Sequence, residues 1–199
     1  MAKMEDLGEV ISTDLLIVGG GLGGLVAAIK AKEVLVDVLV VDKQTVGWSG
    51  KAPKVGGGLW VRMPDDDVDK IAEYHVRNIG CYLNDQELLY SYIRETYGAI
   101  EQLAEWGVKL ARDAEGKLQT VKHPAGLWSG TGLDRDMLLP LQAEARKMGA
   151  KILNKVQVVE LLKQGDRVVG AVGFNIIDGR FYIFKSKATI LANGSCNYR

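Results

Sequence analysis

Apolar residues near the start of the chain form two short runs, separated by clustered glycines and an alanine-rich stretch. The first run, at 14–18, is apolar after its aspartate and ends at glycine, as expected for a strand buried on both faces of a parallel sheet. The alanine-rich stretch at 25–33 predicts a helix, and the second run, at 36–43, predicts another buried strand that ends with an acid. This order of strand, turn, helix and strand within about thirty residues indicates one βαβ unit.

The middle of the chain has polar residues where helices are expected to begin. We expect helices over 65–77, 84–106 and 134–147. The acids at 65–67 favour a helix N-terminus, Asn84 with Glu87 resembles a capping box, and Asp134 can cap the third helix. A hairpin is expected around the Glu-Gly turn at 115–116.

From Ala150 onward, runs of valine, isoleucine and phenylalanine alternate with Gly-Asp and Asp-Gly turns. This alternation predicts a meander of antiparallel strands. The last strand, at 189–192, is expected to rejoin the parallel sheet. The predicted fold class is therefore α/β, with a Rossmann-like parallel sheet and helices followed by an antiparallel β-meander.

The turn after the first strand reads Gly19-Gly20-Gly21-Leu22-Gly23-Gly24 and fits the pattern GxGxxG. In dinucleotide-binding folds the first glycine permits the tight turn, and the second leaves room for a pyrophosphate. The third lets the helix pack closely on the strand, while the N-terminal amides of that helix face the phosphates. The pattern alone is weak, but here it follows a strand and opens a helix. We expect Gly19, Gly21, Leu22, Gly23 and Gly24 to bind a dinucleotide.

An acid stands where the second strand ends. Asp42 lies 18 residues beyond Gly24, at the position that binds a ribose hydroxyl in such folds. A carboxylate there repels a 2′-phosphate, so the sequence disfavours NADP and leaves FAD and NAD open. Lys43 is the next candidate cofactor-binding residue.

Charge and cysteine content exclude several other classes. Lysine and arginine together number 25, as do aspartate and glutamate, so nothing indicates a nucleic-acid or anionic membrane partner. Cys81 and Cys196 form neither a CxxC motif nor a metal-ligand spacing, and no metal site is expected. We expect both thiols to be reduced and the protein to be cytoplasmic.

The most apolar stretch, at 15–29, does not predict a membrane segment. It is shorter than the roughly 20 residues that a membrane helix needs, and five of its residues are glycine. The segment before it carries four acids, the wrong charge for a signal peptide. We expect neither a targeting segment nor direct membrane insertion.

Three segments together resemble the flavoprotein subunits of the fumarate reductase and succinate dehydrogenase superfamily: VGGGLGGLVAAIKA, VVDKQTVGWSGKAPKVGGG and KATILANG. The resemblance covers nearly the whole chain and implies FAD rather than NAD. Within the superfamily, VVGAVGFNIIDGRFYIFKSKATILANG and EWGVKLARDAEGK are most similar to alpha subunits of adenylylsulfate reductases. The chain would then be the N-terminal part of an FAD-binding domain, over 1–199, without the capping domain and C-terminal part of that superfamily.

The resemblance also assigns the remaining candidate site residues. The loop beneath the flavin ring is matched by Ser49, Gly50, Gly56, Gly57 and Gly58. The usual Ala-Thr-Gly-Gly strand end is matched by Ala192, Asn193 and Gly194, and Val156 marks the segment whose backbone holds the adenine. Thr131-Gly132 fits a Thr-Gly found near the substrate side.

Two departures from the superfamily pattern affect the chemistry. Gly50 stands where succinate dehydrogenases carry the histidine that bonds to the flavin, so we expect noncovalent FAD. Trp60 or Val61 stands where an asparagine would contact a nucleotide substrate, which leaves the substrate open. Catalytic residues are not identified. His75 and His123 are interpreted as surface or core residues, and Arg62 is a weaker candidate for facing an anionic substrate.

The resemblance implies an FAD-dependent oxidoreductase subunit. Its flavin would exchange electrons between a small anionic substrate and an iron–sulfur protein subunit. The alternative is an FAD-binding electron-transfer or assembly module without substrate turnover of its own.

Overall fold

The computed structural model of the chain describes residues 7–55 and 58–195. Gly56 and Gly57 of the predicted flavin loop, and Cys196, lie outside the described residues. The chain divides into two compact units, one made of residues 7–55 with 135–195 and the other of residues 58–134.

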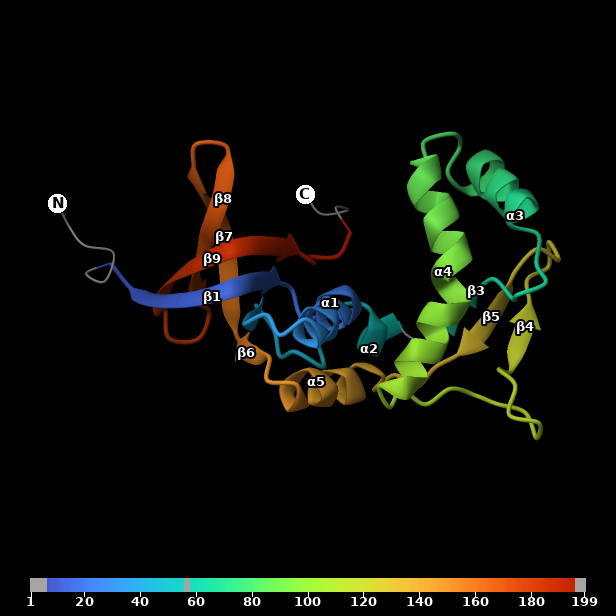
Figure 1. Ribbon diagram of the computed structural model, residues 1–199, viewed down its shortest axis with the longest axis horizontal. Helices are drawn as coiled ribbons and strands as arrows, with labels where there is room; N and C mark the ends of the chain where they lie inside the picture. Colours follow the sequence, from blue (N-terminus) through green and yellow to red (C-terminus); the bar gives the residue numbers. More distant parts are fainter. Residues whose placement is uncertain (1–6, 56–57, 196–199) are drawn as a thin grey trace. The chain divides into compact units, whose positions relative to one another are not determined.

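The first unit is built on a six-stranded sheet of order β6-β2-β1-β9-β8-β7. Its strands are β1 (Glu9–Val18), β2 (Val38–Asp42), β6 (Lys151–Asn154), β7 (Val156–Gln164), β8 (Arg167–Asn175) and β9 (Phe181–Leu191). The strands β6, β2, β1 and β9 are parallel, whereas β9, β8 and β7 form an antiparallel meander. Figure 1 shows β1 (blue) running beside β9 (red), the two ends of the chain. The α/β fold, the meander and the return of its last strand are confirmed.

The strand β1 is longer than predicted because its first half has only one strand neighbour. Leu16 and Ile17 are fully buried and Val18 nearly so, which explains the continuous apolar run. Before Asp14 the strand is exposed or half-buried except at Thr13, which is buried, and this part pairs with β9 from Glu9 onward but not with β2. This first part of β1 has no continuous apolar run, and the strand was predicted only from the apolar run that ends at Val18.

Helices α1 (Leu22–Glu33) and α5 (Leu138–Lys147) pack against each other in this unit, next to the short helix α2 (Ala52–Val55) (Figure 1). The face of α1 formed by Leu25, Ala28 and Ile29 is fully buried, which explains the alanine-rich sequence. Asp134 does not cap α5, contrary to the prediction. That helix begins after Met137, which is buried, so burial of apolar residues sets its start.

The second unit combines a small antiparallel sheet with three helical segments. The sheet has order β3-β5-β4, with β3 (Gly58–Val61), β4 (Thr120–Lys122) and β5 (Ser129–Gly132). The helical segments are α3 (Val68–Tyr74), a π-helical turn (His75–Ile79) and α4 (Gln86–Glu105). Gly58, predicted to belong to the loop beneath the flavin ring, lies at the start of β3.

Both helices predicted in this unit begin next to an acid, each later than predicted. Asp67 caps α3 by accepting hydrogen bonds from the N–H groups of Asp69 and Lys70. The cap of α4 is Asp85, which accepts a 3.0 Å bond from the Leu88 N–H, and not Asn84. The predicted hairpin is present as an antiparallel bridge between Arg112 and Leu118.

Candidate functional site

The turn between β1 and α1, residues 19–24, is termed the glycine turn, and two of its glycines are required by packing. Gly19 has φ +109°, and a Cβ there would lie 2.4 Å from the carbonyl oxygen of Ala192. A Cβ on Gly24 would lie 1.9 Å from the carbonyl oxygen of Gly19. The start of α1 therefore sits directly on the turn, and the turn sits against the end of β9.

A Cβ on Gly20 would lie 2.3 Å from Cγ2 of the Val46 side chain, whereas Gly21 and Gly23 are not explained by packing. A Cβ on Gly21 or Gly23 would meet no described atom within 4 Å. Gly21 is the N-cap of α1, and no side chain in the described part of the protein caps the helix there. The start of α1 thus has open space at two glycines and no side-chain cap, and the N-terminal amides of a helix suit an anionic group such as a pyrophosphate.

Asp42, at the end of β2, is tied to the glycine turn. One carboxylate oxygen accepts a 2.6 Å bond from the N–H of Gly20, and the other accepts a 2.6 Å bond from the N–H of Gln44. The residue is 9% exposed, so its carboxylate is held in place at the rim of the turn. Lys43 beside it is exposed.

Residues 44–50, termed the loop 44–50, lead from Asp42 back to the glycine turn. A Cβ on Gly50, which has φ +78°, would lie 3.6 Å from the Cα of Gly21. Ser49 is only 2% exposed, yet its Oγ has no hydrogen-bond partner among the residues that the structure describes. A buried hydroxyl without a partner is costly, which makes this atom a candidate for bonding to a ligand.

The end of β9 approaches the same turn. The N–H of Ala192 donates a 2.8 Å bond to the carbonyl of Val18, beyond the last pair of strand residues. Asn193 and Gly194 follow it and are exposed, and Gly194 has φ +83°. The structure therefore brings together the glycine turn, Asp42, Ser49-Gly50 and the end of β9, as the sequence predicted.

The remaining predicted residues that the structure describes lie in the core of the sheet or in the second unit. Val156 is buried in the apolar core of the sheet, so only its backbone is available to a ligand. Gly58 belongs to the second unit, where it pairs with Gly132 of β5. Thr131 is buried there, and its hydroxyl donates a 3.0 Å bond to the carbonyl of Gln119.

The second unit contains an aromatic cluster of Trp60, Tyr74, His75, Tyr92, His123 and Trp128. The ring of His123 stacks on Trp128 at 4.1 Å, and His75 meets Trp60 edge-on at 5.3 Å. Burial, together with the nearby His123, lowers the pKa of His75. These contacts agree with the interpretation of both histidines as packing residues.

Arg62 lies beside this cluster. One terminal nitrogen of its guanidinium donates a 2.8 Å bond to the carbonyl of Pro64, within its own loop. Its backbone N–H donates a 3.0 Å bond to the hydroxyl of Thr96. One terminal nitrogen is thus bonded within its own loop, whereas the buried Nε has no hydrogen-bond partner among the residues that the structure describes.

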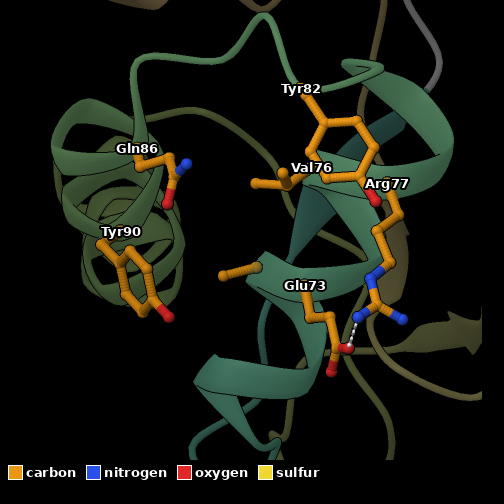
Figure 2. A pocket seen from close by; sticks show the side chains of 7 residues that line it. Glu73, Val76, Arg77, Tyr82, Gln86 and Tyr90 are labelled. Atoms are coloured by element: carbon orange, nitrogen blue, oxygen red, sulfur yellow. Dashed lines mark ion pairs between the residues drawn. The ribbon is translucent and has the colours of Figure 1, made fainter.

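Figure 2 shows a hollow of about 240 Å³ in the second unit. Gln86 and Tyr90 of α4 line one side, and Glu73 and Arg77 line the other. Glu73 and Arg77 form an exposed ion pair of 2.9 Å one helical turn apart. The hollow shares no residue with the glycine turn, and its lining carries no cofactor-binding pattern.

Two further observations concern the described part of the chain. Within residues 7–55 and 58–195, no three histidine, cysteine or acidic side chains are grouped as metal ligands would be. In the same ranges, no helix combines the length and the apolar character needed to span a membrane.

Comparison with known proteins agrees with this geometry. A family model described as an FAD binding domain matches residues 14–198. The chain is 26% identical over 201 residues to one of the subunits of the fumarate reductase (CoM/CoB) of Methanothermobacter marburgensis, covering 96% of this chain and 36% of that protein. It is 26% identical to the alpha subunit of the adenylylsulfate reductase of Megalodesulfovibrio gigas, covering 92% of this chain and 31% of that protein.

A solved structure of adenylylsulfate reductase from Archaeoglobus fulgidus matches with a TM-score of 0.76 and 29% identity. The match covers 95% of this chain and 31% of that one. The chain thus spans about a third of the length of the relatives that it matches.

Proposed function

This chain belongs to the FAD binding domain family, and on that premise we propose that the glycine turn, Asp42 and the loop 44–50 hold the dinucleotide of FAD. The observation that carries the proposal is the meeting of these three segments: Asp42 bonds to Gly20, and Gly50 lies against Gly21. An open helix N-terminus, a fixed acid and a returning loop are the features that a pyrophosphate, a ribose and a flavin require.

Two features of the site fit a bound dinucleotide. The open space over Gly21 and Gly23 accommodates a group that a side chain there would displace. The buried Oγ of Ser49 provides a hydrogen-bonding group beside that space. Neither feature has a packing role, and both suit a phosphate or flavin edge.

Each segment has a distinct role in the proposal. The amides at the start of α1 bind the pyrophosphate, and Asp42 accepts hydrogen bonds from the ribose. The backbone around Val156 holds the adenine, since the side chain is buried. The remaining residues are assigned to the flavin side or to its flanks by the resemblance: Lys43, Ser49, Gly50, Gly56, Gly57, Gly58, Ala192, Asn193 and Gly194.

FAD, when bound, supplies the redox chemistry of an oxidoreductase. The residues of this chain bind it, orient it and keep it noncovalent, since Gly50 offers no nucleophile. The relatives are named as a fumarate reductase and an adenylylsulfate reductase. We therefore propose that the substrate is a small anionic oxidant and that the electron partner is an iron–sulfur subunit. We propose that this chain is part of an FAD-binding domain.

The test uses the protein expressed from its complete gene. We expect it to bind FAD in a fluorescence titration and not NADP. The Ser49→Ala variant should bind FAD more weakly, whereas Ser129→Ala, an equally buried serine in β5, should bind it like the wild type. Absence of FAD binding would refute the proposal.

The proposed oxidoreductase activity is tested by a separate measurement. We expect the reduced, bound flavin to be reoxidised under anaerobic conditions by fumarate or by adenylylsulfate. Bound flavin that neither oxidant reoxidises would refute the proposed substrate class while leaving the FAD site intact.

A further inference from the structure

The loop 44–50 is not part of any strand, so something other than sheet pairing must hold it. It is held chiefly at Val46, whose backbone is bonded on both sides by side-chain amides. The Val46 N–H donates a 3.0 Å bond to Oδ1 of Asn154, at the end of β6. The Val46 carbonyl accepts a 2.9 Å bond from Nε2 of Gln142, on α5. Two residues about a hundred positions away thus satisfy one buried backbone unit.

Val46 packs against the glycine turn. Val46 is fully buried, and its Cγ2 lies 2.3 Å from where a Cβ on Gly20 would be. The next residue, Gly47, has φ +91°, and a Cβ there would lie 3.1 Å from Oε1 of Gln142. Any movement of the Gln142 or Asn154 amide therefore alters how the loop lies against the turn.

A further hydrogen bond connects the loop 44–50 to the segment that we assign to the adenine. The N–H of Lys155 donates a 3.1 Å bond to the carbonyl of Gln44. Lys155 itself has φ +62° and directly precedes Val156. The end of β6 thus continues to hold the loop through the Asn154 side chain and the Lys155 backbone.

We propose that Gln142 and Asn154 are positioning residues for the flavin. They set where the loop 44–50 lies beneath the ring and thereby set the affinity and the midpoint potential of bound FAD. The inference rests on the proposed function. Neither residue touches the cofactor in this account. Each acts through Val46, which is fully buried.

The chemistry of Gln142 provides a sharp test. In Gln142→Met the donor is lost while the length is kept. In Gln142→Glu the carboxylate faces the Val46 carbonyl at neutral pH and repels it, but a protonated carboxyl can donate an O–H to that carbonyl. FAD affinity of Gln142→Glu should therefore recover as the pH is lowered, whereas that of Gln142→Met should not.

The matched control is Asn78→Ala. Nδ2 of Asn78 donates a 3.1 Å bond to the carbonyl of Tyr74, an exposed amide-to-carbonyl bond in the second unit. Three measurements are made on each protein, expressed from its complete gene: the FAD dissociation constant, the midpoint potential of the bound flavin, and hydrogen exchange of the peptide that contains the loop 44–50. The exchange measurement requires no bound FAD.

We expect Gln142→Met and Asn154→Ala to raise the FAD dissociation constant roughly tenfold, as for the loss of one buried hydrogen bond. In both variants the midpoint potential of bound FAD should shift, and the amides of the loop 44–50 should exchange faster. Asn78→Ala should match the wild type in all three measurements. The inference would be overturned if the wild type binds FAD and both variants show the same FAD affinity, midpoint potential and loop exchange as the wild type. The proposed function would then remain intact. A wild type that binds no FAD would overturn the proposed function itself.

Discussion

The Asp42 carboxylate accepts a 2.6 Å hydrogen bond from the backbone N–H of Gly20. The acid that follows β2 and the turn that follows β1 are thereby fixed to each other. Because the second oxygen of Asp42 is bonded to the N–H of Gln44, the same carboxylate also fixes the start of the loop 44–50. One side chain therefore links the proposed ribose, pyrophosphate and flavin segments.

Removal of this carboxylate should weaken FAD binding. We expect Asp42→Ala to lose roughly 1.5–3 kcal/mol of binding free energy, the range for hydrogen bonds to a charged group. Fluorescence titration with FAD measures the loss. Asp37→Ala is the matched control, since Asp37 precedes the same strand and forms an ion pair with Lys151 away from the turn. Equal FAD affinity in the two variants would remove Asp42 from the site.

The glycines of the turn should separate binding from folding. Gly21 has φ −76°, which valine tolerates, and open space around its Cβ position. We expect Gly21→Val to keep its circular dichroism spectrum and thermal midpoint but to lose FAD. Gly24→Ala should instead lower the thermal midpoint, because its Cβ would collide with the carbonyl of Gly19. A Gly21→Val protein with a full flavin load would show that the phosphate does not lie there.

The flavin should be released by acid. A covalent bond requires a nucleophilic side chain at the ring, and Gly50 provides none in the matching place. We expect acid precipitation of the holoprotein to leave all of the FAD in the supernatant. Yellow colour that stays in the washed pellet would identify a covalent link through another residue.

The histidine in the aromatic cluster should make stability depend on pH. Burial and the neighbouring His123 lower the pKa of His75 below its ordinary value of 6.5. The folded chain therefore binds this proton less readily than the unfolded chain does, and protonation favours unfolding. Stability from His75 should be fully present above pH 6.5 and fall as the pH drops below it.

Urea unfolding of the wild type and of His75→Phe, followed from pH 8 to pH 5, measures this contribution. We expect the unfolding free energy of the wild type to fall relative to that of the variant on the acid side, since only the wild type contains the group. Parallel pH profiles would show that the surroundings of His75 do not disfavour its charged form.

Some errors of prediction at element ends have a common cause. Asp85 caps α4 one residue after the predicted Asn84, and α5 starts after the buried Met137 rather than at Asp134. Local capping propensity does not fix the first residue of a helix, and packing of the helix decides where it begins.

The sequence by itself determined the βαβ order, the glycine turn and the acid after β2. These features depend on local properties: apolar runs, the conformational freedom of glycine and a fixed spacing along the chain. Only the tertiary structure decided which distant residues hold the site. Gln142 and Asn154 were not predicted, because an amide that bonds to a backbone about a hundred residues away leaves no periodic or local signal. Such contacts arise when the sheet orders β6 beside β2 and α5 beside α1, and that order is set by burial of the whole core.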